Sequence, residues 1–125
     1  MAMTLLLPGS AEGRTLKLPS LSLWGGIDPA TGRLSDPALP HCGESVRGRV
    51  LMIAEPVGSS SSSAVLLELL HAGTAPAAIV LGRADAIVGL GILVAREMGW
   101  ATIPLAVMAP SEQEEIADGQ LLRIE

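Results

Sequence analysis

The sequence predicts an α/β fold built from a small parallel sheet, an antiparallel sheet and helices. In the second half of the chain, short apolar segments alternate with helical ones in the order strand, helix, strand, helix, strand, which is typical of parallel strands covered by helices. The first half contains extended segments separated by turns, which favour antiparallel strands. Because 49% of the 125 residues are hydrophobic, we expect a single domain over residues 1–125, with layers of sheet, sheet and helix.

The first half is predicted to be extended as far as a long loop. Thr4–Leu7 and Thr15–Leu18 are expected to be short strands on either side of a Pro-Gly-Ser turn. The segment Leu21–Asp28 begins extended and breaks at its Gly-Gly pair, and we expect its Trp24 to lie in the core. The loop that follows is rich in Pro and Gly, and its Asp-Pro and Thr-Gly pairs are typical of turns. Arg49–Ala54 is predicted to be a buried strand.

The second half is predicted to alternate between helices and strands. Gly73 and Gly99 directly follow the two helical patterns, in the position of a C-terminal cap, and Asp85 is expected to cap the start of the second helix. The stretch Ala86–Ala95 is apolar nearly all round, which indicates a fully internal core helix; the alternative is a helix that also faces a partner. The expected elements are a helix over residues 60–71, a strand over 77–81, a helix over 85–98, a strand over 103–108 and a strand over 120–124.

Charge and composition argue against several classes of protein. A net charge of −5 and the lack of a basic run make nucleic acid a poor partner. The longest apolar run is too short to span a bilayer, and the N-terminal residues lack the basic region and the long apolar core of a secretory signal. The one cysteine, Cys42, cannot form an internal disulfide. We therefore expect a cytoplasmic protein without a membrane partner.

Five consecutive serines, Ser59–Ser63, lie at the predicted turn between the buried strand and the first helix. Ligands bind at the carboxyl ends of strands in open α/β sheets, and a helix start offers unpaired N–H groups that suit an anion. Gly58 lets the backbone approach a ligand closely. The alternative is a capping serine followed by solvated serines, although four serines in one first turn exceed what capping requires. The patterns of a nucleotide P-loop and of a hydrolase nucleophile elbow are both absent.

Four segments carry a family resemblance: "LSLWGGIDPATGRLSD", "GSSSSSAVLLELLHAGTAPAAIVL", "DAIVGLGILVAREM" and "IPLAVM". Together, and in this order, they resemble the swivelling domain, or small subunit, of aconitase X. The resemblance implies a swivelling β/β/α three-layer fold and a hydro-lyase (dehydratase) component that is inactive without its large subunit. It also implies that the large subunit holds an iron–sulfur cluster. Cys42 alone cannot hold such a cluster, which needs several thiolates.

The same resemblance implies roles for the serine turn. Ser59 is expected to be the catalytic base, because it directly follows Gly58 as the base follows glycine in aconitase-type swivelling domains. No residue of this chain is expected to bind a metal. The residues expected to bind substrate are Gly58, Ser60, Ser61 and Ser62.

The substrate and one alternative function are left open by the residues. Known family activities include dehydration of cis-3-hydroxy-L-proline and of mevalonate 5-phosphate. The first is preferred here because Val57 stands where the family usually has an arginine, and Val57 cannot donate charge-assisted hydrogen bonds to a phosphate. The alternative is a non-catalytic binding or carrier module of the same fold, for which His71 is the candidate phosphorylated residue.

Overall fold

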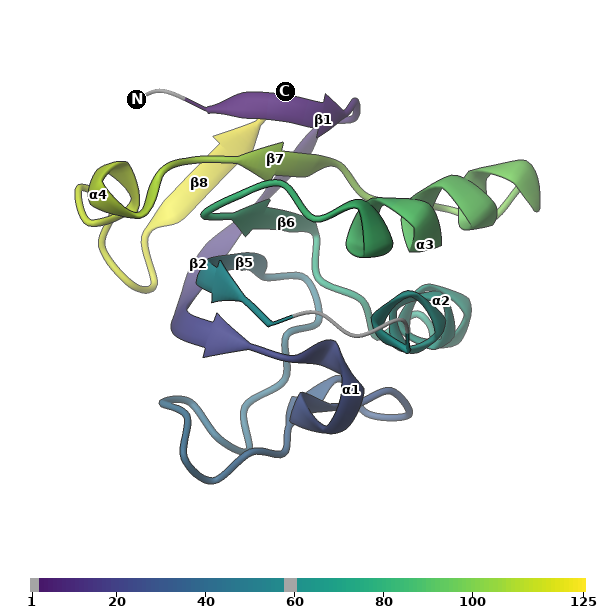
Figure 1. The fold of residues 1–125 in the computed structure, drawn as a ribbon, viewed down its shortest axis with the longest axis horizontal. Helices are drawn as coiled ribbons and strands as arrows, with labels where there is room; N and C mark the ends of the chain where they lie inside the picture. Colours follow the sequence, from purple (N-terminus) through teal and green to yellow (C-terminus); the bar gives the residue numbers. More distant parts are fainter. Residues whose placement is uncertain (1–2, 58–60) are drawn as a thin grey trace.

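The protein is described here by a computed structural model, which covers residues 3–57 and 61–125. Six strands form one mixed sheet in the order β1-β7-β6-β5-β2-β8, and two short strands form a separate antiparallel pair (Figure 1). The strands of the large sheet are β1 (Thr4–Leu7), β2 (Ala11–Leu21), β5 (Val50–Pro56), β6 (Ala78–Leu81), β7 (Leu105–Val107) and β8 (Leu121–Ile124). The pair consists of β3 (Ile27–Asp28) and β4 (Arg33–Leu34), and the helices are α1 (Leu23–Gly26), α2 (Ser62–Ala72), α3 (Ala86–Glu97) and α4 (Pro110–Gln113).

The large sheet has a parallel centre and antiparallel edges. Strands β2, β5, β6 and β7 run parallel, whereas β1 pairs antiparallel with β7 and β8 pairs antiparallel with β2. Strand β2 takes part in both kinds of pairing. Its residues 11–14 pair antiparallel with β8, and its later residues pair parallel with β5. The predicted α/β class is confirmed, and each predicted strand is present.

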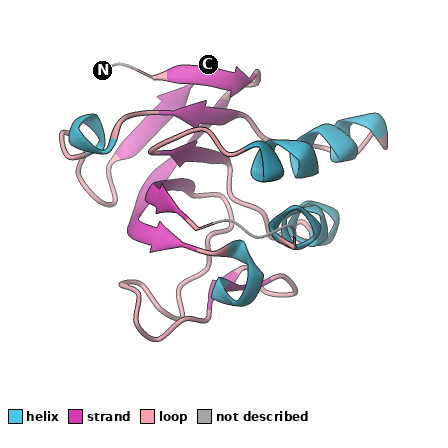
Figure 2. Ribbon diagram, viewed as in Figure 1, coloured by secondary structure: helices cyan, strands magenta, loops and turns pink. Residues whose placement is uncertain are grey.

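The inner parallel strands β5, β6 and β7 are buried on both faces over most of their length, which explains why they are continuous apolar runs in the sequence. One face packs under α2 and α3, which lie side by side over it (Figure 2). On the opposite face α4 contacts β5, and Ile116, which follows α4, belongs to the buried cluster there. The helix-side cluster includes Leu51, Ile53, Ile79, Leu81, Leu66, Leu69 and Ile92. The cluster on the opposite face includes Val50, Met52, Val80, Ala106, Met108, Ile116, Leu122 and Ile124.

Two predictions about burial are wrong. Trp24 is 64% exposed rather than part of the core. The chain turns at Gly25, whose φ of 81° is in the left-handed region, so that Leu23 and Gly26 are buried and the indole is left outside. The helix α3 is not fully internal either, because Leu90 is 53% exposed and lies on its outer face.

The helix ends follow the predicted signals closely. α2 begins at Ser62, two residues after the predicted start, and Gly73 closes it with a φ of 75° and an N–H directed at the carbonyls of Leu69 and Leu70. Asp85 caps α3 as predicted, accepting hydrogen bonds from the N–H groups of Ile87 and Val88. None of the helices in the described ranges is long and apolar enough to cross a membrane.

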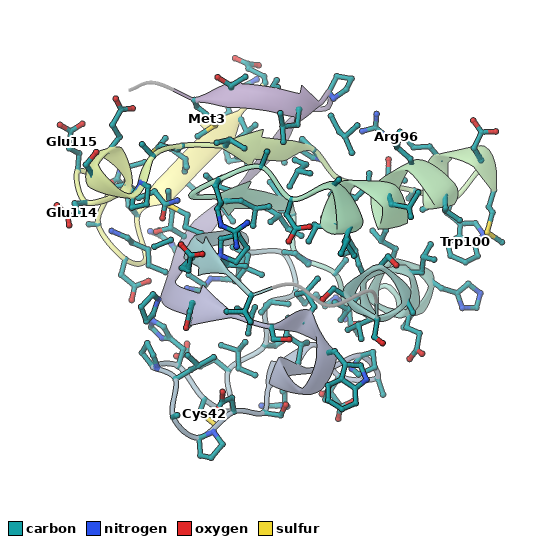
Figure 3. The ribbon with its side chains drawn as sticks, viewed as in Figure 1. Met3, Cys42, Arg96, Trp100, Glu114 and Glu115 are labelled. Atoms are coloured by element: carbon teal, nitrogen blue, oxygen red, sulfur yellow. The ribbon has the colours of Figure 1, made fainter. Side chains whose placement is uncertain are left out.

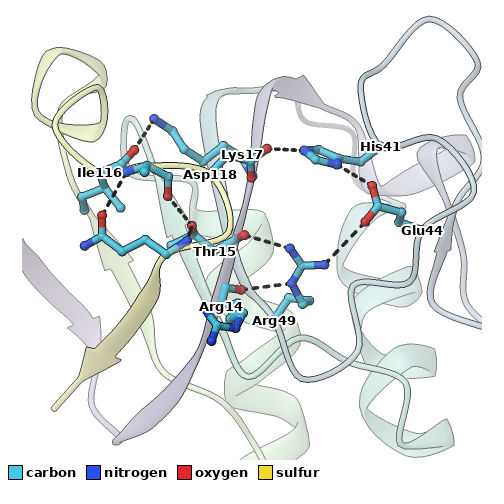
Figure 4. A network of polar contacts seen from close by, with 10 residues as sticks. Arg14, Thr15, Lys17, His41, Glu44, Arg49, Ile116 and Asp118 are labelled. Carbon is cyan, nitrogen blue, oxygen red and sulfur yellow. Dashed lines mark hydrogen bonds and ion pairs between the residues drawn. The ribbon is translucent and has the colours of Figure 1, made fainter.

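A polar network fastens the long loop after β4 to the turn before β8 (Figure 4). His41 lies between two carboxylates, with Nδ1 2.5 Å from Glu44 and Nε2 2.5 Å from Asp118. Arg49 extends the network, because its Nη1 is 3.7 Å from Glu44 and its Nη2 donates to the Thr15 carbonyl. The backbone N–H of Lys17 donates to Asp118. The network thus joins three segments that are far apart in sequence.

The network shifts two pKa values in opposite directions. The hydrogen bond to Glu44 raises the pKa of His41, partial burial opposes the shift, and Asp118 adds to it. Partial burial works against ionisation of Asp118, but hydrogen bonds from the Lys17 N–H and His41 and the nearby positive charges outweigh it, so the pKa of Asp118 is lowered. Both shifts favour the ion pair between His41 and Asp118 at mildly acidic and neutral pH.

We predict that His41→Asn lowers stability in a pH-dependent way. The raised pKa means that His41 contributes its full stabilisation below its ordinary value of 6.5 and loses it as the pH rises through the folded-state value. Near pH 6 the free energy of unfolding of the wild type should therefore exceed that of the variant. Because both carboxylates are exposed and solvent weakens the ion pairs, the difference should be at most about 1 kcal/mol. Urea unfolding at pH 6 and pH 9 measures the gap, and a gap that is equal at both values contradicts the prediction. Asparagine tolerates the positive φ of 64° at this position.

We also predict opposite effects at two glycines of α3. A Cβ at Gly89 would lie 3.7 Å from Leu105 Cδ2, which is ordinary contact, whereas a Cβ at Gly91 would lie 3.0 Å from the Ser63 carbonyl oxygen of α2. Gly89→Ala should raise the free energy of unfolding by about 0.5–1 kcal/mol through helix propensity. Gly91→Ala should be less stable than Gly89→Ala by about 1–3 kcal/mol, because α2 must move away. Equal stabilisation of both variants in denaturant titrations would count against this packing.

Candidate functional site

The carboxyl ends of β2, β5 and β6 lie along one edge of the sheet, where open α/β sheets bind ligands. After β5 the chain passes through Val57 into the serine run and α2, and after β6 it passes through Gly82 and Arg83 into α3. The end of β2 continues into α1, which contacts α2. The starts of the two long helices and the turn of α1 therefore surround the same edge.

The described part of the serine run begins α2. Ser61 occupies the N-cap position, is exposed and makes no capping hydrogen bond through its side chain. Ser62 is the first helical residue and is 1% exposed, and Ser63 is half-buried. The structure thus places Ser61–Ser63 at a helix start after a parallel strand, as the sequence indicates. The predicted base Ser59 and the predicted substrate-binding residues Gly58 and Ser60 lie outside the described residues.

Ser62 and Asp85 line the same narrow crevice. Its volume is about 10 Å³, roughly the space that one water molecule needs, so it does not hold a substrate in the described part of the chain. A hydroxy acid bound at this edge would need space bounded by another surface. The crevice is lined by Leu21, Leu23, Ile53, Pro56, Val57, Ser62, Ile79, Leu81, Asp85 and Val88.

The two helix starts at this edge differ in how their N–H groups are satisfied. The Asp85 carboxylate accepts from Ile87 N–H at 2.9 Å and from Val88 N–H at 3.4 Å. The start of α3 is therefore occupied by its own acidic cap, which also disfavours a second anion there. Ser61 provides no such cap to α2. The acidic cap therefore disfavours an anion at the α3 start, and the first turn of α2 carries no such carboxylate.

Arg83 is a residue that the sequence analysis missed. Its Nη2 donates to the carbonyl of Pro56 at 2.7 Å, and its Nε donates to Glu55 Oε1 at 3.0 Å. A guanidinium therefore lies beside the chain just before the serine run, where Val57 offers no charge. The signal was the position of Arg83 directly after a predicted parallel strand, at the same sheet edge as the serines.

Gly82 fixes the position of Arg83. The N–H of Gly82 donates to the carbonyl of Ile53 at 2.8 Å, and a Cβ on Gly82 would lie 1.8 Å from the carbonyl oxygen of Ala54. No side chain fits at that distance, so only glycine lets the loop after β6 lie directly against the end of β5. This close approach brings the Arg83 side chain within reach of Pro56.

The described residues do not fit an iron–sulfur cluster. Within residues 3–57 and 61–125 there is no group of three or more His, Cys, Asp or Glu side chains that could hold a metal ion. The whole chain has a single cysteine, and Cys42 is exposed on the loop between β4 and β5 (Figure 3). A cluster requires several thiolates, so its ligands would have to come from outside this chain.

Comparison with known proteins gives consistent relatives. A cis-3-hydroxy-L-proline dehydratase of Pseudomonas aeruginosa is 40% identical over 124 residues, which cover 93% of this chain and 21% of that protein. A phosphomevalonate dehydratase small subunit of Methanopyrus kandleri is 46% identical over 71 residues, covering 57% of this chain and 53% of the relative. The corresponding small subunit of Pyrococcus furiosus is 37% identical over 91 residues, covering 72% and 68%. The chain thus spans about a fifth of the first relative and about half of the second.

The fold and the family agree with these relatives. The crystal structure of Thermococcus kodakaraensis aconitase X in its holo form matches 99% of this chain and 92% of that chain with a TM-score of 0.85 and 26% sequence identity. This similarity confirms the swivelling fold expected from the sequence. The family model described as the aconitase X swivel domain matches residues 1–125. The chain therefore belongs to the aconitase X swivel domain family.

Proposed function

We propose that this chain is the small subunit, or swivel domain, of an aconitase X-type hydro-lyase that removes water from a small hydroxy acid. The observation that carries the proposal is the match of the whole chain, residues 1–125, to the swivel domain family. Its relatives are named as dehydratases or as dehydratase small subunits. The geometry supports the same function, because the serine run leads into a helix at the ligand-binding edge of a parallel sheet.

The active site in this proposal is shared with a large subunit. The name "small subunit" of the archaeal relatives implies a larger partner, and this chain spans only 21% of the Pseudomonas relative. The crevice at Ser62 is too small for a substrate, and one cysteine cannot hold a cluster. We therefore assign the iron–sulfur cluster to the partner and expect the isolated chain to be inactive. We include a cytoplasmic location, where a lone thiol stays reduced.

The serine run supplies the base and the substrate contacts in this proposal. Dehydration breaks a C–H bond and a C–O bond, and Ser59 takes the carbon-bound proton. A serine is a weak acid, so its alkoxide needs the positive end of the α2 dipole and the neighbouring hydroxyls to stabilise it. The first turn of α2 carries no acidic residue, so no carboxylate there opposes a negative charge. The residues that bind the substrate are Gly58, Ser60 and Ser61; the fourth predicted residue, Ser62, is 1% exposed and supports the start of α2.

The substrate in this proposal is cis-3-hydroxy-L-proline. The relative of that specificity aligns with 93% of this chain, and Val57 offers no positive charge for a phosphate. Arg83 is held by Glu55 and Pro56, and its positive charge is partly neutralised by that carboxylate. A single guanidinium in this state suits a monoanionic carboxylate better than a phosphate dianion.

We predict that the complex with the large subunit prefers cis-3-hydroxy-L-proline over mevalonate 5-phosphate by at least about 100-fold in kcat/KM, since one site must discriminate an amino acid from a phosphate ester. Steady-state assays of one complex preparation on both compounds give the ratio. Dehydration of mevalonate 5-phosphate with the higher kcat/KM would reject this substrate and leave the dehydratase assignment intact.

We predict that Ser59→Ala abolishes most turnover while folding and partner binding stay intact. Loss of a positioned general base should lower kcat by about 10²–10⁴-fold, whereas loss of a capping hydroxyl costs only about 1 kcal/mol of stability. The matched control is Ser62→Ala, which removes a hydroxyl three residues further along the chain and should mainly weaken substrate binding or have no effect. Turnover, cluster content and thermal unfolding are measured on each assembled complex.

Three outcomes would revise this assignment in different ways. Near-normal turnover for Ser59→Ala with loss of activity for Ser60→Ala or Ser61→Ala would move the base along the run. Normal turnover in every serine variant would make the run a helix cap, and a complex that assembles but dehydrates neither compound would favour the non-catalytic binding module.

A further inference from the structure

An apolar groove runs between β1 and the outer face of α3, and it adjoins the crevice at Ser62 through Asp85. Its volume is about 350 Å³, which is large enough to receive several side chains of a partner. Except for one carboxylate, its lining carries no charge. The groove is lined by Leu6, Leu7, Ala84, Asp85, Ala86, Gly89, Leu90, Leu93 and Leu105.

The walls of the groove carry three large apolar side chains that are exposed. Leu90 is 53% exposed, Leu93 is 47% exposed and Leu6 on the facing strand is 42% exposed. They form one patch because they line the same groove. Contiguous apolar patches of this kind on soluble proteins mark interaction sites. This face also explains why the sequence of α3 is apolar nearly all round although the helix is not internal.

The helix that forms one wall of the groove is fixed by contacts near both of its ends. Asp85 caps the start of the helix, and near the other end the guanidinium of Arg96, labelled in Figure 3, donates to the carbonyl of Pro8 just after β1. Gly89 forms part of the floor, and a Cβ there would still have 3.7 Å to Leu105 and 4.0 Å to Leu7. The floor thus leaves space that the chain itself could have filled with a larger residue.

The groove is continuous with the candidate active-site edge. Asp85 lines both the groove and the crevice that contains Ser62. Ala84 belongs to the same loop after β6, next to Arg83. A body seated in the groove therefore reaches the edge of the sheet where the serine run enters α2.

We propose that this groove is the docking surface for the large subunit, which inserts a ridge of aliphatic or aromatic side chains between β1 and α3. The proposal rests on the proposed function for the existence of that partner. Two facts identify the occupant. The matching relatives are either small subunits or a larger protein of which this chain covers about a fifth. The groove also adjoins the edge of the sheet at which the proposed active site must be completed. Docking there places the partner against the loop after β6, whose Asp85 also lines the crevice at Ser62.

The test compares two equally exposed leucines. Leu90→Glu places a charge in the groove, and the control Leu121→Glu makes the same change on edge strand β8, where Leu121 is 54% exposed. Both side chains are solvent-accessible, so thermal unfolding of the two variants should match the wild type. The aconitase X-type large subunit of the same organism is the probe, and calorimetric titration gives the Kd of each pair. Gly89→Met, which fills the groove without adding charge, is the second variant.

Leu90→Glu and Gly89→Met should weaken binding of the large subunit by at least about 100-fold, as expected for central residues of an interface, while Leu121→Glu should leave Kd unchanged. On complex formation, amide hydrogen exchange should slow in β1 and α3. Unchanged Kd for both groove variants, or a wild-type chain that does not bind the large subunit, would overturn the docking proposal. So would a wild-type homodimer that Leu90→Glu dissociates while binding of the large subunit is unaffected.

Turnover separates this proposal from the proposed function. A wild-type complex that binds through the groove but does not dehydrate either compound supports the docking surface and rejects the activity. A complex that dehydrates cis-3-hydroxy-L-proline with wild-type Kd in both groove variants supports the activity and rejects the docking surface.

Discussion

The close approach of backbones at two glycines is the constraint on which the arrangement of the site depends. At Gly82 the loop after β6 lies against the carbonyl of Ala54, and at Gly91 the helix α3 lies against the carbonyl of Ser63. Neither position has space for a larger side chain without movement of the neighbouring backbone. These contacts set the distance between the ends of β5 and β6 and between the start of α2 and the middle of α3. The chain passes from the end of β5 through the serine run into α2, so both contacts lie beside this connection.

This constraint links several features that would otherwise be unrelated. The loop after β6 carries Arg83 to the Pro56 carbonyl, and it carries Asp85 to the start of α3 and into the crevice beside Ser62. The same loop forms one end of the groove along β1. One short connection thus takes part in the candidate anion site, the helix cap and the proposed docking surface. A displacement of this loop would affect all three at once.

Much of the fold could be predicted from the sequence, because the parallel strands are short apolar runs and the helix ends carry strong signals. Gly73 and Asp85 behave as their sequence positions indicated, because caps depend on local backbone geometry. The exposure of Trp24 and Leu90 to solvent could not be predicted in the same way. Both are large apolar residues in apolar segments, and only the turn at Gly25 and the packing of α3 decide which side chains face outward. Periodicity is uninformative where nearly every residue is apolar.

The part of the candidate site that is contiguous in the sequence could be predicted, and the part that depends on strand pairing could not. The serine run is visible in the sequence because it is contiguous and lies at a strand-to-helix turn. Arg83 is a single residue in a different connection, and its relevance arises from the pairing of β5 with β6, which places its loop beside Pro56. A rule that examines every loop after a parallel strand, rather than the most unusual one, would have included it.

The distribution of aromatic residues has a consequence for how this protein is observed. The chain has no Phe or Tyr, and its two tryptophans lie outside the buried core: Trp24 is exposed and Trp100 packs against the ring of His71 with 4.9 Å between centroids. Near-ultraviolet circular dichroism and intrinsic fluorescence therefore report on the surface, at α1 and at the C-terminal end of α2. A state in which the aliphatic core has loosened could retain these spectra. Methyl resonances of leucine, isoleucine and valine are the direct probes of its core.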